Sequence, residues 1–287
     1  MTMLRSLLFV PGNKANMLSK SLGFKPDVVL PDLEDSVPDA EKAHARQSVH
    51  DFLPRLLDGP SRVMPRVNAL DTTWTDDDLA AVVLPGIYGI SIGKIRTPGD
   101  ISEISNRLAK VEARIGIEVG SLRLIPWIET AQAIVACHAI CVASPRIVGV
   151  AFGAEDFTND MGIERLDDDN QLLFARSALC IAARAADVLA LDTPFFQFRD
   201  DEALRANSLA AKQLGFKGRF AIHPSQIETI DACFSPSTEE IAHARRVVAA
   251  YEAAEKQGRG STSLDGRVID VPVVKRARAL LALAASD

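Results

Sequence analysis

The chain has 287 residues, of which 47% are hydrophobic and 24% are charged, a balance typical of a globular protein with a large buried core. Its net charge of −6 argues against a nucleic-acid partner, because such partners are normally bound by a concentrated basic surface. The longest apolar stretch, residues 131–143, is too short to span a bilayer and the N-terminus resembles no secretory signal, so we expect a cytoplasmic protein without a membrane partner.

Short apolar runs alternate with longer helical patterns along the first 224 residues, and this happens eight times. The runs are residues 4–10, 28–35, 62–68, 89–96, 123–130, 146–157, 188–195 and 218–224. Their starts are about 30 residues apart, the length of one strand, one helix and two loops. Each run is nearly all apolar at its beginning, which is typical of parallel strands covered on both faces. The pattern therefore predicts an α/β fold, a closed (β/α)8 TIM barrel.

The helical patterns between these runs carry their own start signals. Residues 39–57 have apolar residues at helical spacing, acidic residues 76–78 precede Leu79, and Pro98 opens a helix that continues through Val111. More than sixty residues follow the eighth run, beginning with a capped helix start at residues 235–240. We therefore predict a catalytic barrel over residues 1–234 and a C-terminal helical extension over residues 235–287, acting as a lid or a subunit-exchanging arm.

Polar residues concentrate at the C-terminal ends of the predicted strands, which meet at one mouth of a barrel. They are Asp32, Glu34, Asp35, Arg66, Asn68, Lys94, Arg96, Glu129, Thr130, Glu155, Asp156, Asp192 and His223. Such a ring of carboxylates repels itself unless a cation neutralises it, and a hard divalent ion suits oxygen ligands. Glu129 and Asp156 end adjacent predicted strands, so we predict that they bind Mg²⁺, with Mn²⁺ as a substitute. The alternative is a structural ion pair with Arg66 or Lys94.

Seven short motifs follow one another in register with these strands: RSLLFVPGN, PDLEDSVP, RVN, KIRTP, IET, GAEDF and AIHPSQ. In this order they resemble the citrate lyase beta-subunit-like group of the HpcH/HpaI aldolase superfamily, which includes malyl-CoA and citramalyl-CoA lyases. The resemblance covers nearly the whole chain. It implies a TIM barrel that forms homotrimers or hexamers, with Mg²⁺ bound by Glu129 of IET and Asp156 of GAEDF.

The resemblance also implies two residues that act on the substrate. Arg66 of RVN would contact the substrate carboxylate or thioester oxygen. Glu129 would also bind the substrate, and the backbone after Asp156 would help to seat the acid half. Asp270, in the segment VIDVPVVK, matches an Asp that family members place over the mouth of a neighbouring subunit. The alternatives are that Arg66 is a structural clamp and that Asp270 merely ends a turn.

The activity implied is that of a carbon–carbon lyase, an oxo-acid-lyase, with an acyl-CoA and a 2-keto acid as small-molecule partners. It would cleave a β-hydroxyacyl-CoA, such as citramalyl-CoA, malyl-CoA or a citryl-type thioester, to acetyl-CoA and a 2-keto acid. Mg²⁺ would acidify the hydroxyl, Arg66 would stabilise the thioester enolate, and Asp270 would protonate it. Two alternatives stay open: a CoA-independent HpcH/HpaI-type aldolase, and a beta subunit of a multi-subunit citrate lyase that acts on an acyl carrier.

Several further residues have two interpretations each. At least one of Asp32, Glu34 and Asp35 is expected to hold Arg66 or a metal-bound water. His223 either contacts the acyl group or is a hydrogen-bonded structural histidine. Arg5 and Lys14 either meet the phosphates of CoA, as the resemblance suggests, or are surface charges.

Overall fold

The computed structural model describes residues 3–166 and 168–285. These fall into two compact units, one up to Asp231 and one from Ala232. The division lies within helix α9 (Ile227–Phe234), whereas we predicted it at the end of that helix. The lid or arm function of the second unit stays a prediction.

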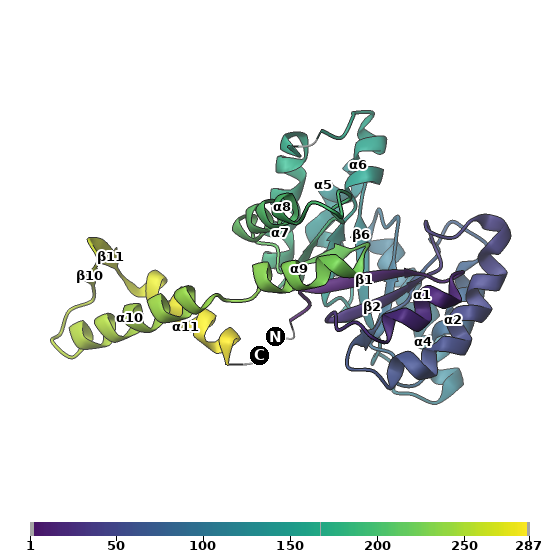
Figure 1. Cartoon of the computed structure of the whole chain (residues 1–287), viewed down its shortest axis with the longest axis horizontal. Helices are drawn as coiled ribbons and strands as arrows, with labels where there is room; N and C mark the ends of the chain where they lie inside the picture. Colours follow the sequence, from purple (N-terminus) through teal and green to yellow (C-terminus); the bar gives the residue numbers. More distant parts are fainter. Residues whose placement is uncertain (1–2, 167, 286–287) are drawn as a thin grey trace. The chain divides into compact units, whose positions relative to one another are not determined.

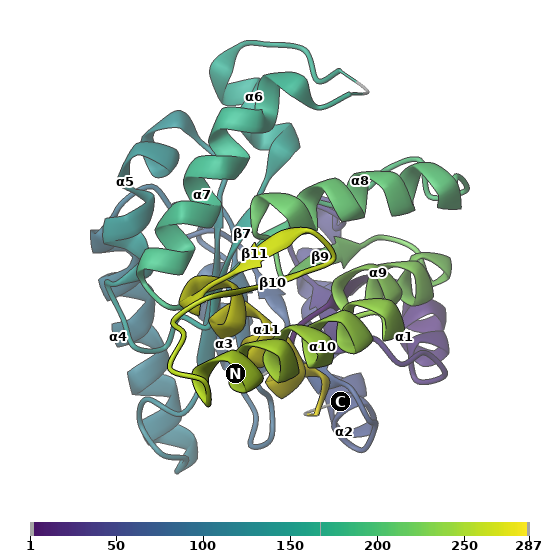
Figure 2. The same cartoon turned by 90° about the vertical axis from the view of Figure 1, so that its left-hand side faces the viewer.

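The first unit is a closed barrel of parallel strands with helices on its outside, as predicted (Figures 1 and 2). Its strands are β1 (Ser6–Pro11), β2 (Val28–Asp32), β3 (Arg62–Val63), β4 (Arg66–Val67), β5 (Gly89–Ile92), β6 (Arg123–Ile128), β7 (Gly149–Phe152), β8 (Leu189–Asp192) and β9 (Gly218–Ala221). They are hydrogen-bonded in the order β1, β9, β8, β7, β6, β5, β4, β2, and β1 also pairs with β2, which closes the ring.

The third position of the barrel is shared by two short strands, where we predicted one. Both β3 and β4 pair in parallel with β2, and residues 64 and 65 separate them. Pro65 has no backbone N–H and cannot donate to the ladder, so the strand is interrupted there. The division does not move Arg66, which pairs with Asp32 across the two strands.

The sixth predicted run, residues 146–157, was too long at its C-terminal end. Strand β7 ends at Phe152, and helix α6 (Ala154–Met161) begins two residues later, after Gly153. Glu155 and Asp156 therefore lie in the first turn of a helix and not at the end of a strand. Acidic side chains are favourable there because they face the positive end of the helix dipole.

The helices predicted from sequence are present, and their ends follow ordinary capping chemistry. Thr97 caps α4 by accepting from the N–H of Asp100, Pro98 occupies the first turn, and Gly116 ends the helix with a φ of 77°. The other helices of the first unit are α1 (Ala15–Ser21), α2 (Lys42–Leu57), α3 (Thr75–Val82), α4 (Pro98–Ile115), α5 (Ala131–Cys141), α7 (Leu173–Ala185) and α8 (Asp201–Leu214). None of the helices described is both long and apolar enough to cross a membrane.

The interior of the barrel is a packed apolar core. It consists of Leu4, Leu7, Val28, Leu30, Met64, Ile125, Trp127, Ala151, Leu189, Leu191 and Phe220. Near the C-terminal ends of the strands the rings of Phe9, Trp127 and Phe220 contact one another, with centroids 4.4–5.7 Å apart. Phe9 and Trp127 also line the candidate site above, so this core forms its floor.

The second unit has its own small core between two helices and a hairpin. Helix α10 (Thr238–Glu255) begins at Ser237 with a capping box to Glu240, and helix α11 (Val271–Ala284) follows the hairpin of β10 (Thr262–Leu264) and β11 (Arg267–Ile269). Its apolar cluster consists of Ala244, Val247, Tyr251, Ile269, Val274 and Ala277. Positive φ angles at Asp265 and Gly266 match the two-residue turns that join antiparallel strands.

Candidate active site

A cavity of about 290 Å³ opens at the C-terminal ends of the barrel strands. Its wall holds most of the carboxylates that we predicted to gather there, together with Arg66. The residues around it include Phe9, Asp32, Asp35, Arg66, Trp127, Glu129, Gly153, Asp156, Thr193 and Phe196. Arg66, Glu129 and Asp156, which we singled out from sequence, therefore line one cavity.

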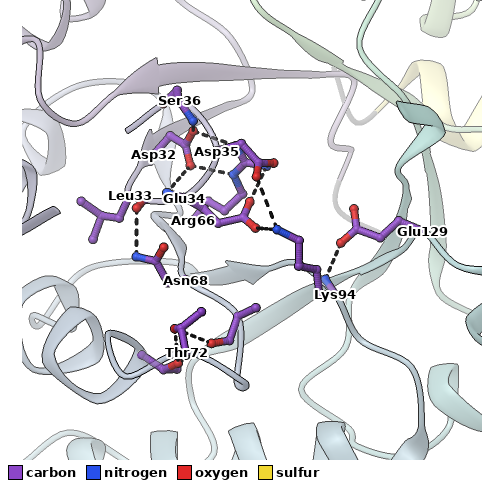
Figure 3. Close-up of polar contacts among 12 residues, drawn as sticks. Asp32, Leu33, Glu34, Asp35, Ser36, Arg66, Asn68, Thr72, Lys94 and Glu129 are labelled. Carbon is purple, nitrogen blue, oxygen red and sulfur yellow. Dashed lines mark hydrogen bonds and ion pairs between the residues drawn. The ribbon is translucent and has the colours of Figure 1, made fainter. Parts of the chain in front are cut away.

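Arg66 is buried and is held by three carboxylates (Figure 3). Its Nε and Nη2 donate to the two oxygens of Asp32 at 2.6 and 2.7 Å, and Nη1 lies 2.9 Å from Glu34 and 3.1 Å from Asp35. The guanidinium carbon lies 4.4 Å from the ring centroid of Phe9. The planar guanidinium of Arg66 is therefore held by hydrogen bonds along its edge and by the ring of Phe9 on its face.

In the cluster formed by Asp32, Glu34, Asp35 and Arg66, Asp32 accepts two hydrogen bonds from the guanidinium of Arg66. It also accepts from the backbone N–H groups of Glu34 and Ser36, at 3.0 and 3.2 Å. Burial alone would raise the pKa of Asp32, but the charge and hydrogen bonds of Arg66 outweigh burial, so the pKa lies below its ordinary value. Asp32 is therefore ionised and holds Arg66 in one orientation.

The loop after β2 is fixed from below by two side chains. Lys42 donates to the carbonyl oxygens of Leu33 and Glu34 at 2.9 and 2.8 Å. Asn68 donates to the carbonyl oxygen of Leu33 at 2.9 Å (Figure 3). The acidic loop consequently keeps its shape although its carboxylates repel one another.

Lys94 connects the Arg66 cluster to Glu129, a role that the sequence did not indicate (Figure 3). Its Nζ lies 2.8 Å from Glu34 and 3.5 Å from Asp35, and its backbone N–H donates to the carboxylate of Glu129. Its φ of 58° is in the left-handed region, which costs free energy for a residue with a Cβ. The strained backbone aims this N–H at Glu129.

Glu129 is 5% exposed and has no cationic partner in a salt bridge among the described residues. Burial, followed by the charges of Asp156 and Glu34, raises the pKa of Glu129 to about 8. Burial and the charge of Asp35 also raise the pKa of Asp156, which is half-buried in the first turn of α6. The alternative of a structural ion pair with Arg66 or Lys94 is not seen for either carboxylate in the described part of the chain.

These two carboxylates fit a divalent ion. Burial, followed by the charges of neighbouring carboxylates, raises the pKa of both groups, and a hard cation bound to them would supply the opposite charge. Among residues 3–166 and 168–285, no group of three or more His, Cys, Asp or Glu side chains is arranged to bind a metal. A site with two protein carboxylates leaves the remaining positions to water and substrate, as Mg²⁺ prefers.

Asp270 lies in the second unit and caps α11. Its exposed carboxylate accepts from the N–H of Val273 at 3.2 Å. This exposed carboxylate caps the helix, and its predicted catalytic function at the mouth of a neighbouring subunit stays a prediction.

Two other sequence-based candidates have identifiable contacts. His223 lies 2.8 Å from the hydroxyl of Ser225 and stacks on Phe198, as a structural histidine would, while its contact with an acyl group stays untested. Arg5 precedes β1 and pairs with Asp27 at 2.9 Å, at the opposite end of the strand from the first βα loop. Arg5 therefore does not flank that loop, and its contact with the phosphates of CoA stays a prediction.

Known proteins resemble this chain along most of its length. The family model described as HpcH/HpaI aldolase/citrate lyase matches residues 5–224. Citrate lyase subunit beta of Escherichia coli (strain K12) is 39% identical over 280 residues, which cover 98% of this chain and 93% of that protein. A (3S)-malyl-CoA thioesterase of Cereibacter sphaeroides (strain KD131) is 36% identical, with 98% and 94% covered.

Solved structures show the same similarity. The protein CitE from Mycobacterium tuberculosis, in complex with magnesium, acetoacetate and coenzyme A, superposes with a TM-score of 0.82 at 29% identity, covering 99% of both chains. A citrate lyase beta subunit of the same organism, complexed with oxaloacetate and magnesium, has a TM-score of 0.69 at 28% identity, covering 82% of this chain and 98% of that one.

Proposed function

Because the chain belongs to the HpcH/HpaI aldolase/citrate lyase family, we propose that it is a magnesium-dependent carbon–carbon lyase. Its proposed substrate is a β-hydroxyacyl-CoA of the citramalyl, malyl or citryl type, and its products are acetyl-CoA and a 2-keto acid. The observation that carries the proposal is that Glu129 and Asp156 share one cavity with Arg66 and form no salt bridge with any residue that the structure describes. The relatives named with magnesium, oxaloacetate and coenzyme A support it.

Glu129 and Asp156 are the proposed ligands of Mg²⁺, which Mn²⁺ would replace. When bound, the divalent ion lowers the pKa of the substrate hydroxyl and stabilises the carbonyl oxygen that forms from it. Glu129 is kept in place by the backbone N–H of Lys94, and Asp156 by its position at the start of α6. Glu129 also forms the wall against which the acid half of the substrate rests.

Arg66 is the proposed partner of the acyl half. Cleavage of the bond between the carbinol carbon and the thioester α-carbon, with the hydroxyl proton released to water, leaves an electron pair on the thioester as an enolate. A guanidinium whose orientation is fixed by Asp32 stabilises this charge without reorganising, a contribution on the order of 3 kcal/mol. The enolate carbon then takes a proton, for which Asp270 of a second copy is the proposed general acid. The proposed working form is therefore a homo-oligomer, and the family resemblance favours a trimer or hexamer.

The proposal is tested by incubating the purified protein and Mg²⁺ with citramalyl-CoA, malyl-CoA and citryl-CoA separately. Acetyl-CoA should appear with pyruvate, glyoxylate or oxaloacetate, each identified by chromatography, and a chelator should abolish the reaction. Counting thiol release alongside separates cleavage of the carbon–carbon bond from thioester hydrolysis, the activity in the name of the Cereibacter relative. Failure to cleave all three thioesters in the presence of Mg²⁺ contradicts the proposal.

A second candidate is the beta subunit of a multi-subunit citrate lyase that acts on an acyl carrier. It is favoured by the 39% identity to Escherichia coli citrate lyase subunit beta over nearly the full length of both chains. The discriminating measurement compares citryl-CoA with a citryl group on an acyl carrier protein. A preference for the carrier of about 100-fold in kcat/KM, equal to a difference of about 3 kcal/mol, would favour this candidate.

A further inference from the structure

A second cavity of the first unit lies where the barrel strands begin, at the end opposite the candidate active site. Its volume is about 470 Å³. Arg62 and Arg123 in its wall are the first residues of β3 and β6, and Tyr88 directly precedes β5. The N–H of Arg123 donates to the carbonyl of Tyr88 at 3.0 Å, and the N–H of Tyr88 donates to that of Val63 at 2.9 Å. Arg62, Tyr88 and Arg123 are therefore neighbours across the sheet.

The wall of this cavity carries two cations and no acid. Its lining contains Arg62 and Arg123 but neither Asp nor Glu, in a chain with a net charge of −6. Neither arginine forms a salt bridge with any residue that the structure describes. Arg62 and Arg123 are exposed to solvent at the cavity, whereas the buried arginines Arg66, Arg146, Arg176 and Arg219 all pair with carboxylates. Guanidinium groups match carboxylate and phosphate in geometry, so an anionic ligand would complete this cavity.

Two further features favour a ligand here. The guanidinium carbon of Arg62 lies 5.5 Å from the ring centroid of Tyr88, a contact that limits its conformations before binding. Ser61, also in the wall, has a buried hydroxyl oxygen without a hydrogen-bond partner in the described structure. Buried polar atoms are nearly always partnered, so this hydroxyl is a donor available to a bound oxygen.

The size and field of the cavity agree with a small anion. Its volume falls within the range of about 300–1,000 Å³ found for small-molecule sites. Helix α2 ends at Leu57, which lies in the wall, so the C-terminal end of its dipole, with a partial charge of about −0.5, faces the cavity. Two full positive charges outweigh that partial charge, so the local field still attracts anions.

We propose that this cavity is a binding site for a small anion with two or more negative charges, either phosphate or a dicarboxylate, held by Arg62 and Arg123. The site is independent of the proposed catalytic function. Because it lies at the other end of the strands, an anion bound there does not compete with the substrate.

Calorimetric titration of the full chain with inorganic phosphate, and separately with succinate, tests the proposal. A chelator is present so that no divalent ion draws either anion to the barrel mouth. We expect saturable binding of at least one anion, and the pair of titrations identifies which chemistry the site takes. Arg62→Ser with Arg123→Ser should weaken the affinity by about ten-fold or more. The matched control, Arg184→Ser with Arg246→Ser, removes the same charge from exposed ion pairs elsewhere and should leave the affinity unchanged.

Two readouts keep the test valid even if the double variant folds poorly. Ser121→Asp places a negative charge in the wall and should weaken binding to a similar degree. In the wild-type protein, phenylglyoxal modification of Arg62 and Arg123, read by peptide mass spectrometry, should slow when the anion is present, while that of Arg184 should not. Absence of saturable binding of both anions, or labelling of Arg62 and Arg123 that the anion leaves unchanged, overturns the proposal.

Discussion

Glu129 is a buried carboxylate whose charged neighbours are mainly other carboxylates, and its ionisation is therefore linked to the stability of the fold. Burial, then the charges of Asp156 and Glu34, raises its pKa from 4.5 to about 8. The folded state then binds a proton that the unfolded state has lost, so the free energy of unfolding falls as pH rises from about 4.5 to about 8. In metal-free protein we expect a fall on the order of a few kcal/mol across this window, measured by urea denaturation.

The control for this prediction is Glu129→Gln, which cannot ionise. Its free energy of unfolding should depend less on pH over the same window, whereas at low pH the two proteins should be similar. Mg²⁺ competes with the proton for Glu129, so the metal affinity of the wild-type protein should increase with pH up to about 8. Parallel stability curves for wild-type and Glu129→Gln protein would contradict the assignment of the raised pKa.

Arg66 supplies a second test at the scale of one residue. Arg66→Lys keeps the positive charge but loses the planar fork that Asp32 holds by two hydrogen bonds. We expect kcat/KM for thioester cleavage to fall by about 100-fold with little change in Mg²⁺ affinity. The matched control is Arg46→Lys, because Arg46 pairs with Asp77 and Asp78 away from the cavity. Equal losses of activity in the two variants would show that Arg66 has no special function.

At this scale, the sequence was sufficient to select Arg66, Glu129 and Asp156 but not their partners. The three stand near the ends of predicted strands, and strand ends meet at a barrel mouth. The contact of the Lys94 backbone with Glu129 was not predictable, because it depends on a left-handed backbone conformation that no residue pattern indicates. The expected partner of Arg66 in the acidic loop was left open among three residues, and all three contact it.

The junction between β7 and α6 controls the candidate metal site through one glycine. A Cβ on Gly153 would lie 2.5 Å from Oε2 of Glu129 and 2.7 Å from its Cβ. Gly153→Ala must therefore displace Glu129 or the start of α6, which carries Asp156. A displacement of about 1 Å should lower kcat/KM on the order of 100-fold and weaken Mg²⁺ binding.

Gly260→Ala is the control for this substitution, since a Cβ there meets nothing within 4 Å. Its activity and metal affinity should equal those of the wild-type protein. Thermal unfolding of both variants separates a local effect from a loss of fold. If Gly153→Ala binds Mg²⁺ as tightly as the wild-type protein, Glu129 is not held in place by close contact with this glycine.

At the scale of the element, periodicity predicted eight barrel positions correctly because each run is long enough to be apolar on both faces. It failed where a single residue changed the backbone. Pro65 interrupts the third run by lacking an N–H, and Gly153 ends the sixth run earlier than its apolar pattern does. Phe157 was predicted to be part of a strand but is a buried residue of helix α6. A short apolar stretch does not distinguish a buried strand from a buried helix segment.

The proposed catalytic residues of one chain are divided between its two units. Arg66, Glu129 and Asp156 line one cavity of the first unit, while Asp270 belongs to the second unit, where its carboxylate is exposed at the start of α11. If Asp270 serves another copy of the chain, each active site is made by two chains. A homo-oligomer is then required for activity.

This predicts complementation between two inactive variants. Glu129→Gln and Asp270→Asn should each have little activity alone, because one lacks a metal ligand and the other the general acid. When the two are co-refolded in equal amounts, a site that combines an intact barrel from one chain with an intact Asp270 from another forms by chance in about a quarter of cases. We therefore expect about a quarter of the wild-type rate of acetyl-CoA formation.

The alternative gives a different result in the same experiment. If Asp270 acted within its own chain, every site in the mixture would contain one of the two substitutions, and no activity would be regained. Ala substitution at Asp270 would add a loss of stability, since it removes the cap of α11, worth about 1 kcal/mol. Asn keeps the capping oxygen, so loss of the rate in Asp270→Asn without loss of stability, followed by recovery on mixing, assigns the proton transfer to a neighbouring copy.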